Sequence, residues 1–308
     1  MENTCAPNRY DKKNNTCFSL DQLLELSSAF NRYYFKNSVG VDQKTNMGST
    51  SPINIKPDKK YLLMELRDRF KTVCNGNDSC MLEQSFMKEI VGEMRDDLVN
   101  NTFRSKGPNN GSTEWLSTLD IDNVMKQYQN VYSNFHFVGA IPADCHILKF
   151  CSLNKINYNQ LISKGIRYIG IIFNLDTHEK PGSHWVATLI DINNGYIYYC
   201  DSTGHPPTSH IKSFIDIFIY EYEKITNKKA QLKYNTKKYQ TDNSECGIYS
   251  CNFIIRMLAG ETFDHIVNNY LTFADINSCR DTYFLNNNKS VKVHAYCDPA
   301  KSTWTLTK

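Results

Sequence analysis

The chain has 308 residues, 41% of them hydrophobic and 22% charged, with a formal net charge of +3. This is enough for one substantial hydrophobic core and an accessory region. Basic and acidic residues are interleaved, so no long basic run can neutralise many phosphates, and nucleic acid is a weak candidate partner. No apolar run has the length of a membrane span, and the polar residues 1–13 lack the apolar centre of a signal peptide. We expect a soluble, cytoplasmic protein.

The sequence of residues 1–110 predicts a small helical arm. A helix over 19–35 opens with a capping box formed by Ser19 and Gln22, a second helix follows Pro57, and a third covers 79–99. The run 104–111, rich in Gly, Asn and Pro, is the strongest linker signal. We therefore place a domain boundary at 110.

Residues 111–275 predict an α+β core with a mixed central sheet flanked by helices. The predicted helices cover 120–132, 158–164 and 209–224, with a buried helix starting at Cys246, and the predicted strands cover 135–138, 168–173, 185–192, 196–200 and 231–234. Residues 276–308 are left as a C-terminal extension.

Eleven cysteines are scattered along the chain, and none forms a C-x-x-C pair. We expect most of them to be free, buried thiols, because their number is odd and no secretory signal is present. Cys74 and Cys80 flank a turn-forming run, so a disulfide or half of a metal site remains an alternative there. The histidines show no H-E-x-x-H motif and no helical pairing, and we expect neither a metal nor a cofactor.

Cys246 opens the segment with the clearest chemical signal. The turn-like run 242–245 precedes it, and apolar residues at helical spacing follow as far as Gly260, a suitable helix cap. Cys246 should therefore lie in the first turn of a helix, where unpaired N–H groups and the helix dipole favour a thiolate. Gly247 should let the backbone approach a reacting carbonyl closely. The sequence predicts a nucleophilic thiol at Cys246.

His184 and Asp201 supply a base and a group to orient it. His184 stands where a polar loop enters an apolar strand, and residues 193–195 form a turn into the next strand. According to which residues occupy the turn, Asp201 lies opposite Val186 or Thr188, both an even number of positions from His184. Either register places Asp201 on the same face as His184, where a carboxylate can orient the imidazole.

Gln240 completes the set with a side-chain amide that can donate to an oxyanion. Taken singly, each residue has an ordinary structural explanation, since a Cys-Gly pair often begins a helix and the run 201–204 is typical of a turn. All four residues in one order, each on a suitable support, favour a cysteine protease instead.

The segments 182–187, 199–204 and 240–249 resemble the ubiquitin-like-protein-specific cysteine proteases. This superfamily includes SUMO proteases, adenovirus protease and the polyprotein maturation proteases of large DNA viruses such as African swine fever virus, and the similarity is greatest to the viral group. The resemblance covers residues 112–270. It implies a SUMO-protease-like core with a nucleophile, a general base and acid, an orienting residue and an oxyanion donor at Cys246, His184, Asp201 and Gln240.

The same resemblance implies roles for two tryptophans. Trp185 would cover a narrow channel that admits glycine residues before the cut bond. Trp115 is the candidate for the second wall, although the segment 114–117 matches the family only in part and a core tryptophan explains it equally well. Asp201 departs from the swine fever virus enzyme, which has Asn there, and matches the SUMO proteases; either residue can hold an imidazole.

The resemblance implies an endopeptidase that cleaves viral structural polyproteins after small residues, at Gly-Gly-x sites, during virion maturation. The resemblance also implies that this endopeptidase acts in the host cytoplasm or in the virion. A protease that deconjugates SUMO or another ubiquitin-like protein is the first alternative, because it would use the same catalytic residues. An inactive protease-fold scaffold is the second, and the presence of all four catalytic residues argues against it.

Overall fold

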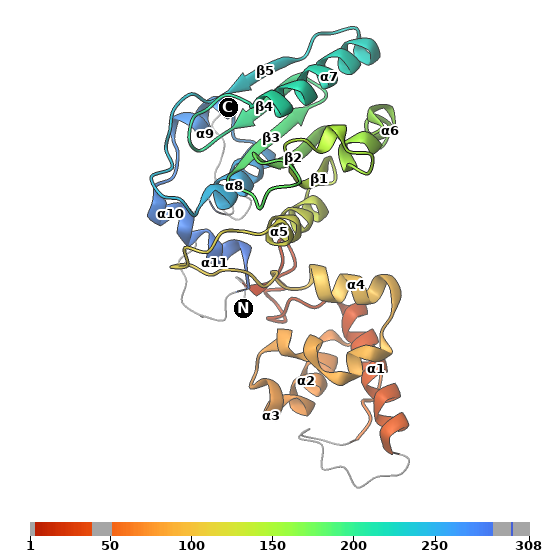
Figure 1. The fold of residues 1–308 in the computed structure, drawn as a ribbon. Coiled ribbons are helices and arrows are strands. Elements are labelled where there is room, and N and C mark those ends of the chain that lie inside the picture. The colour runs from red at the N-terminus through yellow and green to blue at the C-terminus, as the bar shows by residue number, and fades with distance from the viewer. Residues whose placement is uncertain (1–3, 39–50, 286–296, 298–308) are drawn as a thin grey trace. The chain divides into compact units, whose positions relative to one another are not determined.

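The computed structural model describes residues 4–38, 51–285 and 297 (Figure 1). The chain divides into two compact units, Met1–Arg104 and Ser105–Lys308. The division falls at the start of the predicted linker 104–111. No helix within the described ranges is long and apolar enough to cross a membrane.

The first unit is built from helices, as predicted: α1 (Leu20–Ser38), α2 (Lys59–Arg69), α3 (Lys71–Cys74), 3-10 helices over Asp78–Glu83 and Ser85–Glu89, and α4 (Gly92–Asn101). The predicted capping box is formed at the start of α1. The Gln22 N–H donates to Ser19 Oγ at 3.1 Å, and the Ser19 N–H donates to Gln22 Oε1 at 2.9 Å. These bonds satisfy N–H groups that the first turn of a helix leaves without partners.

The prediction of one continuous helix over 79–99 is wrong. Gln84 adopts an extended conformation with ψ of 154°, and Gly92 has φ of +66°, so the chain forms two 3-10 helices followed by α4. Packing explains the interruption, because Phe86 stacks on Phe70 with ring centroids 5.1 Å apart and meets the edge of Phe30. The buried aromatic contacts outweigh the local preference for helix.

The second unit has the predicted α+β architecture. Its five strands are β1 (Phe135–Pro142), β2 (Tyr168–Asn174), β3 (Trp185–Asp191), β4 (Tyr196–Cys200) and β5 (Gln231–Tyr234). They form one mixed sheet in the order β1-β2-β3-β4-β5, in which both outer pairs are parallel and both inner pairs antiparallel (Figure 1).

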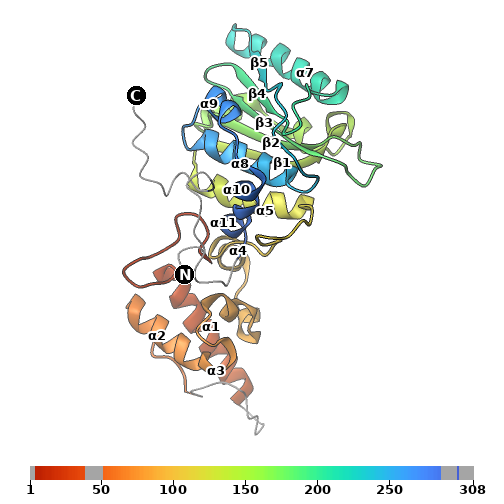
Figure 2. The same cartoon turned by 90° about the vertical axis from the view of Figure 1, so that its left-hand side faces the viewer.

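Helices cover both faces of this sheet (Figures 1 and 2). One core contains residues of α5 (Thr118–Val131) and α8 (Cys246–Leu258), and the other contains residues of α7 (Ser209–Thr226), with α6 (Tyr158–Ser163) packed at its side. Successive residues of β3 point to opposite faces, so Ala187 packs in the α8 core and Val186 in the α7 core. Every residue of α8 is buried.

The chain after α8 forms α9 (Phe263–Asn268), α10 (Phe273–Ser278) and α11 (Arg280–Tyr283). Tyr283 and Phe284 are fully buried in the same core as α5 and α8. Residues 276–285, predicted as part of a C-terminal extension, therefore pack into the core of the second unit. Apolar surface at 283–284 has no partner until the tertiary fold provides one.

The expectation of mostly free thiols is wrong. Eight of the eleven cysteines form disulfides, pairing Cys5–Cys17, Cys74–Cys80, Cys145–Cys151 and Cys279–Cys297. All four bonds join cysteines separated by 6 to 18 positions, which short turns and helix ends bring within bonding distance. Only Cys200, Cys246 and Cys251 are free.

Candidate active site

His184 lies at the end of a loop that is fixed to the neighbouring strand. Asn174, the last residue of β2, accepts hydrogen bonds through Oδ1 from the N–H groups of Asp176 at 3.0 Å and Ser183 at 3.2 Å. Gly182 has φ of +99°, and a Cβ there would lie 2.6 Å from the Asn174 amide nitrogen. The glycine of the Gly-Ser-His motif is thus required for the loop to pack against Asn174.

Asp201 meets His184 across the hairpin of β3 and β4. Ala187 pairs with Cys200, so the continued register places Asp201 opposite Val186, the first of the two predicted alternatives. His184 Nε2 lies 2.7 Å from Asp201 Oδ1. Since Nε2 faces Asp201, Nδ1 is the ring nitrogen left for another partner.

Asp201 is fully buried, and hydrogen bonds hold both its backbone and its carboxylate. Its backbone exchanges hydrogen bonds with the Asn235 side chain, at 2.9 Å to the Asp201 N–H and 2.6 Å to the carbonyl. Its carboxylate accepts from the N–H and hydroxyl of Thr203 at 2.7 to 2.8 Å. Asn235 is a supporting residue that the sequence analysis misses, because no local motif marks it.

Cys246 is the first residue of α8, as predicted, and its side chain is almost fully buried. Asp242 Oδ1 accepts from the N–H groups of Ser244 at 2.7 Å and Glu245 at 2.9 Å, which fixes the turn before the helix. Gly247 serves packing: a Cβ there would lie 3.0 Å from Leu116 Cβ. The close approach of the Gly247 backbone to a reacting carbonyl stays a prediction.

The imidazole and the carboxylate are stabilised in their charged forms. Burial lowers the pKa of His184, but hydrogen bonds with Asp201 and Cys246 outweigh burial and raise the pKa from 6.5 to about 9. Burial raises the pKa of Asp201, but bonds from His184 and Thr203 prevail and hold this pKa below its ordinary value. The arrangement therefore favours an imidazolium between a carboxylate and a thiol.

Gln240 is buried beside this group, and its side chain is held at both ends. Its Oε1 accepts a hydrogen bond from the Ser202 hydroxyl, and Nε2 donates to the Asp242 carbonyl at 2.9 Å. An amide nitrogen carries two hydrogens, so one N–H remains for a further acceptor. Ser202, which orients the amide, is another residue that the sequence analysis does not single out.

Trp185 and Trp115 both line a pocket of 550 Å³, which we call the Trp pocket. Trp185 is 7% exposed and donates through Nε1 to the Leu116 carbonyl at 2.9 Å. Trp115 is 47% exposed, so it is not the core tryptophan that the sequence also allows. The rest of the wall comes from the ends of β1 and β2 and from the loop before His184.

The family model described as the C-terminal catalytic domain of the Ulp1 protease family matches residues 125–294. The match covers more than half of the chain and contains all four predicted catalytic residues. The chain belongs to the Ulp1 protease family. It is therefore a cysteine-type peptidase, a hydrolase.

Viral proteins are among the relatives of this Ulp1-family chain. A thiol protease of Acanthamoeba polyphaga mimivirus is 52% identical over 300 residues, covering 97% of this chain and 99% of that protein. A cysteine protease of African swine fever virus is 22% identical over 215 residues, covering 64% and 78% of the two chains. The crystal structure of an African swine fever virus protease shares the fold, with a TM-score of 0.61, 18% identity and coverage of 91% and 95%.

A buried ion pair lies next to Cys246 of this Ulp1-family protease. Arg280 contacts both carboxylate oxygens of Glu245, with Nη2 to Oε1 at 2.8 Å and Nε to Oε2 at 3.1 Å. Asn277 donates to the same carboxylate at 3.0 Å and to the Ser112 carbonyl at 2.9 Å. This network joins α10 and α11 to the residue before Cys246 and to the segment that carries Trp115.

A second histidine and carboxylate pair lies beside the Trp pocket. His178 Nδ1 is 2.7 Å from Asp144 Oδ2, and the His178 N–H donates to Asp144 Oδ1 at 3.0 Å. His178 lines the pocket and its side chain is half exposed, whereas Asp144 is buried. The bond to Asp144 raises the pKa of His178 despite some desolvation. The pair fixes the loop that leads to His184.

Proposed function

We propose that this Ulp1-family protease is an endopeptidase that cleaves viral structural polyproteins after small residues, at Gly-Gly-x sites, during virion maturation. The observation that carries the proposal is the 2.7 Å contact of His184 with Asp201, beside a Cys246 thiol that opens a buried helix. This is the arrangement that activates a thiol for acyl transfer.

The proposed reaction begins with the Cys246 thiolate. It attacks the carbonyl carbon of the cut bond, and the carbonyl oxygen becomes an oxyanion. The protonated His184, acting through Nδ1, gives its proton to the leaving amine, so the C–N bond breaks and an acyl-enzyme remains. Neutral His184 then removes a proton from water, which attacks the thioester. The C–S bond breaks, and the acid product and the Cys246 thiolate are released beside a protonated His184.

Asp201 and Gln240 would act on charge and orientation. Asp201 keeps Nε2 protonated and the ring aligned, because its carboxylate is fixed by Thr203 and its backbone by Asn235. The free N–H of Gln240 would donate to the oxyanion, and the first-turn N–H groups of α8 add positive potential at the same end.

The preference for small residues rests on the Trp pocket. Trp185 is fixed at its wall by the bond to the Leu116 carbonyl, and Trp115 lies on the same pocket with an exposed ring. Aromatic walls beside the cut bond favour a substrate backbone without side chains. The viral sources of the relatives support a polyprotein substrate.

We place the activity in the virion or the host cytoplasm. The four disulfides favour the virion, because cytoplasmic glutathione keeps most thiols reduced. A free Cys246 is compatible with either place.

Deconjugation of a ubiquitin-like protein is the second candidate. It is favoured by the family match and by the name SUMO-1 cysteine protease, given to several of the swine fever virus relatives. An inactive scaffold is disfavoured, because His184, Asp201 and Cys246 are all present and His184 is bonded to Asp201.

Cleavage of a Gly-Gly-x peptide library, in parallel with SUMO and ubiquitin fusions, separates these functions. Wild type is compared with Cys246→Ala and with Cys251→Ala, which removes another buried thiol of α8. Peptide cleavage that only Cys246→Ala abolishes, with intact fusions, supports the polyprotein protease. Cleavage of fusions alone supports deconjugation, and inactivity on every substrate supports the scaffold.

A further inference from the structure

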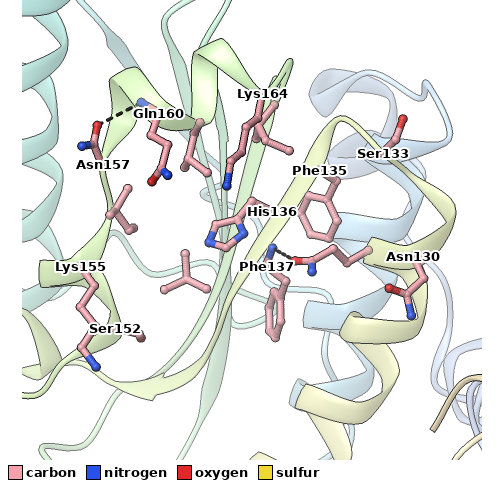
Figure 3. Close-up of a pocket in the computed structure, with 15 residues that line it drawn as sticks. Asn130, Ser133, Phe135, His136, Phe137, Ser152, Lys155, Asn157, Gln160 and Lys164 are labelled. Atoms are coloured by element: carbon pink, nitrogen blue, oxygen red, sulfur yellow. Dashed lines mark hydrogen bonds between the residues drawn. The ribbon is translucent and has the colours of Figure 1, made fainter. Parts of the chain in front are cut away.

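A second pocket of the catalytic unit lies at the edge strand β1 and shares no residue with the Trp pocket (Figure 3). It has a volume of 570 Å³, within the range of roughly 300 to 1,000 Å³ found for small-molecule sites. Its apolar part comes from Phe135, Phe137, Val138, Ile156, Leu161 and Ile166. The pocket therefore offers an apolar surface large enough for a ring.

The ionisable groups of this pocket are all basic. His136, Lys155 and Lys164 line it, and none of the fifteen lining residues is acidic. Figure 3 shows the Lys164 amino group directed toward the His136 ring, with the Gln160 side chain facing the same space. Across the part of the chain that the structure describes, neither lysine side chain has a hydrogen-bond or ion-pair partner. Burial, followed by the charge of Lys164, lowers the pKa of His136.

Two backbone N–H groups at the edge of β1 beside the pocket already have side-chain acceptors. Gln129 Oε1 accepts from the Phe137 N–H at 2.6 Å, and Asp122 Oδ1 accepts from the Ala140 N–H at 2.8 Å. A peptide that added a strand here would have to displace these bonds. Recognition therefore rests on the side chains in the pocket, not on the strand edge.

We propose that this pocket binds an organic anion, in which an apolar body of ring size carries a phosphate or carboxylate group. The anionic group accepts hydrogen bonds from the Lys164 amino group, a His136 ring N–H and the Gln160 amide, which are its natural donors. Lys155 adds positive charge at the rim. The apolar body lies against Phe135 and its apolar neighbours. The bound anion offsets a positive charge that no protein carboxylate in the lining neutralises.

Titrations with phenyl phosphate, benzoate, inorganic phosphate and neutral phenol test this proposal on the full chain. The readout is the NMR signal of the His136 ring, assigned with a His136→Gln variant. We expect saturable shifts with phenyl phosphate or benzoate, and weaker binding of inorganic phosphate and of phenol. The stronger of the two organic anions identifies the anionic group.

Lys164→Gln should weaken binding of the organic anion about tenfold, since one charged hydrogen-bond donor is lost. Lys164 is exposed, so this change leaves the fold intact. Lys229→Gln, which removes the same charge from an exposed site outside the pocket, is the matched control and should bind as wild type. Absence of saturable shifts, equal weakening by the control, or phenol binding as tightly as the anions would overturn the proposal.

Discussion

Arg280 and Glu245 form an ion pair in which both side chains are 0% exposed, and Glu245 directly precedes Cys246. The pair connects α11, near the end of the described chain, to the start of the helix that carries the thiol. Arg280 also donates to the Glu114 carbonyl at 2.8 Å, beside Trp115. One buried cation thus holds both the residue before Cys246 and the segment that forms a wall of the Trp pocket.

Replacing Arg280 by Met should therefore destabilise the catalytic unit strongly. Removing one partner of a buried pair leaves a charge without compensation and costs about 3–5 kcal/mol. Urea unfolding measures the loss. Arg32→Met is the control, because its partner Glu25 is also a carboxylate but the pair is exposed, and it should cost about 1 kcal/mol or less. Equal losses in the two variants would contradict a special role for the buried pair.

Asp201→Asn should lower the pKa of His184 and shift the alkaline limit of activity downward. In wild type the hydrogen bonds to Asp201 and Cys246 overcome burial and raise this pKa to about 9, so kcat/KM should fall as pH rises through about 9. Asp201→Ala should lose more activity than Asp201→Asn, because Asn still holds the ring. A pH profile with an unchanged alkaline limit in Asp201→Asn would argue against this assignment.

The same pKa shift predicts how stability depends on pH. The folded-state pKa of His184 is raised, so its stabilisation is complete below pH 6.5 and is lost as pH rises to about 9. Urea unfolding of wild type should therefore show a decline in stability across this window that Asp201→Asn reduces. His265→Gln, which replaces a half-exposed histidine of α9, is the control and should retain the decline. An equal decline of stability with pH in Asp201→Asn would contradict this prediction.

Trp115→Ala and Trp185→Ala should differ in whether they reduce stability as well as substrate binding. Trp115 is 47% exposed, so its loss should raise KM and change the melting temperature little. Trp185 is 7% exposed and bonds the Leu116 carbonyl, so its loss should cost about 3–5 kcal/mol of stability as well. Peptide kinetics and thermal unfolding separate the effects. Unchanged KM in Trp115→Ala would remove Trp115 from the substrate site.

Gly182→Ala should reduce activity by displacing the loop that ends at His184. A Cβ at Gly182 would lie 2.6 Å from the amide nitrogen of Asn174, the residue whose Oδ1 orders the loop, and φ is +99°. Gly165→Ala is the matched control, because φ is +76° but nothing lies within 4 Å. Both variants should lose roughly 1 kcal/mol or more to backbone strain, but only Gly182→Ala should lower kcat. Equal kcat values would show that Asn174 can move aside.

Thiol counting tests the disulfides. The unfolded chain should show three free thiols before reduction and all eleven after it. Cys279→Ser should lower stability by about 3 kcal/mol, because it opens a closed loop of 18 positions in the unfolded state. More than three thiols before reduction would contradict the pairing, and peptide mapping by mass spectrometry would show which bond is absent.

Local sequence was sufficient for the elements whose signals are local. The capping box of α1, the hairpin of β3 and β4, and the start of α8 at Cys246 all depend on residues a few positions apart. Strand periodicity also limited Asp201 to the face of His184, because side chains alternate in a strand. The order of the motifs then allowed the protease family to be named.

Contacts between distant segments could not be predicted from the sequence. The break of 79–99 by Phe86 packing, the support of Asp201 by Asn235 and the pair of Arg280 with Glu245 all join residues that no short motif relates. Burial, hydrogen-bond pairing and charge compensation depend on three-dimensional neighbours, which one chain specifies only collectively. The sequence thus determined the family and the predicted catalytic set, and the tertiary structure decided what holds those residues in place.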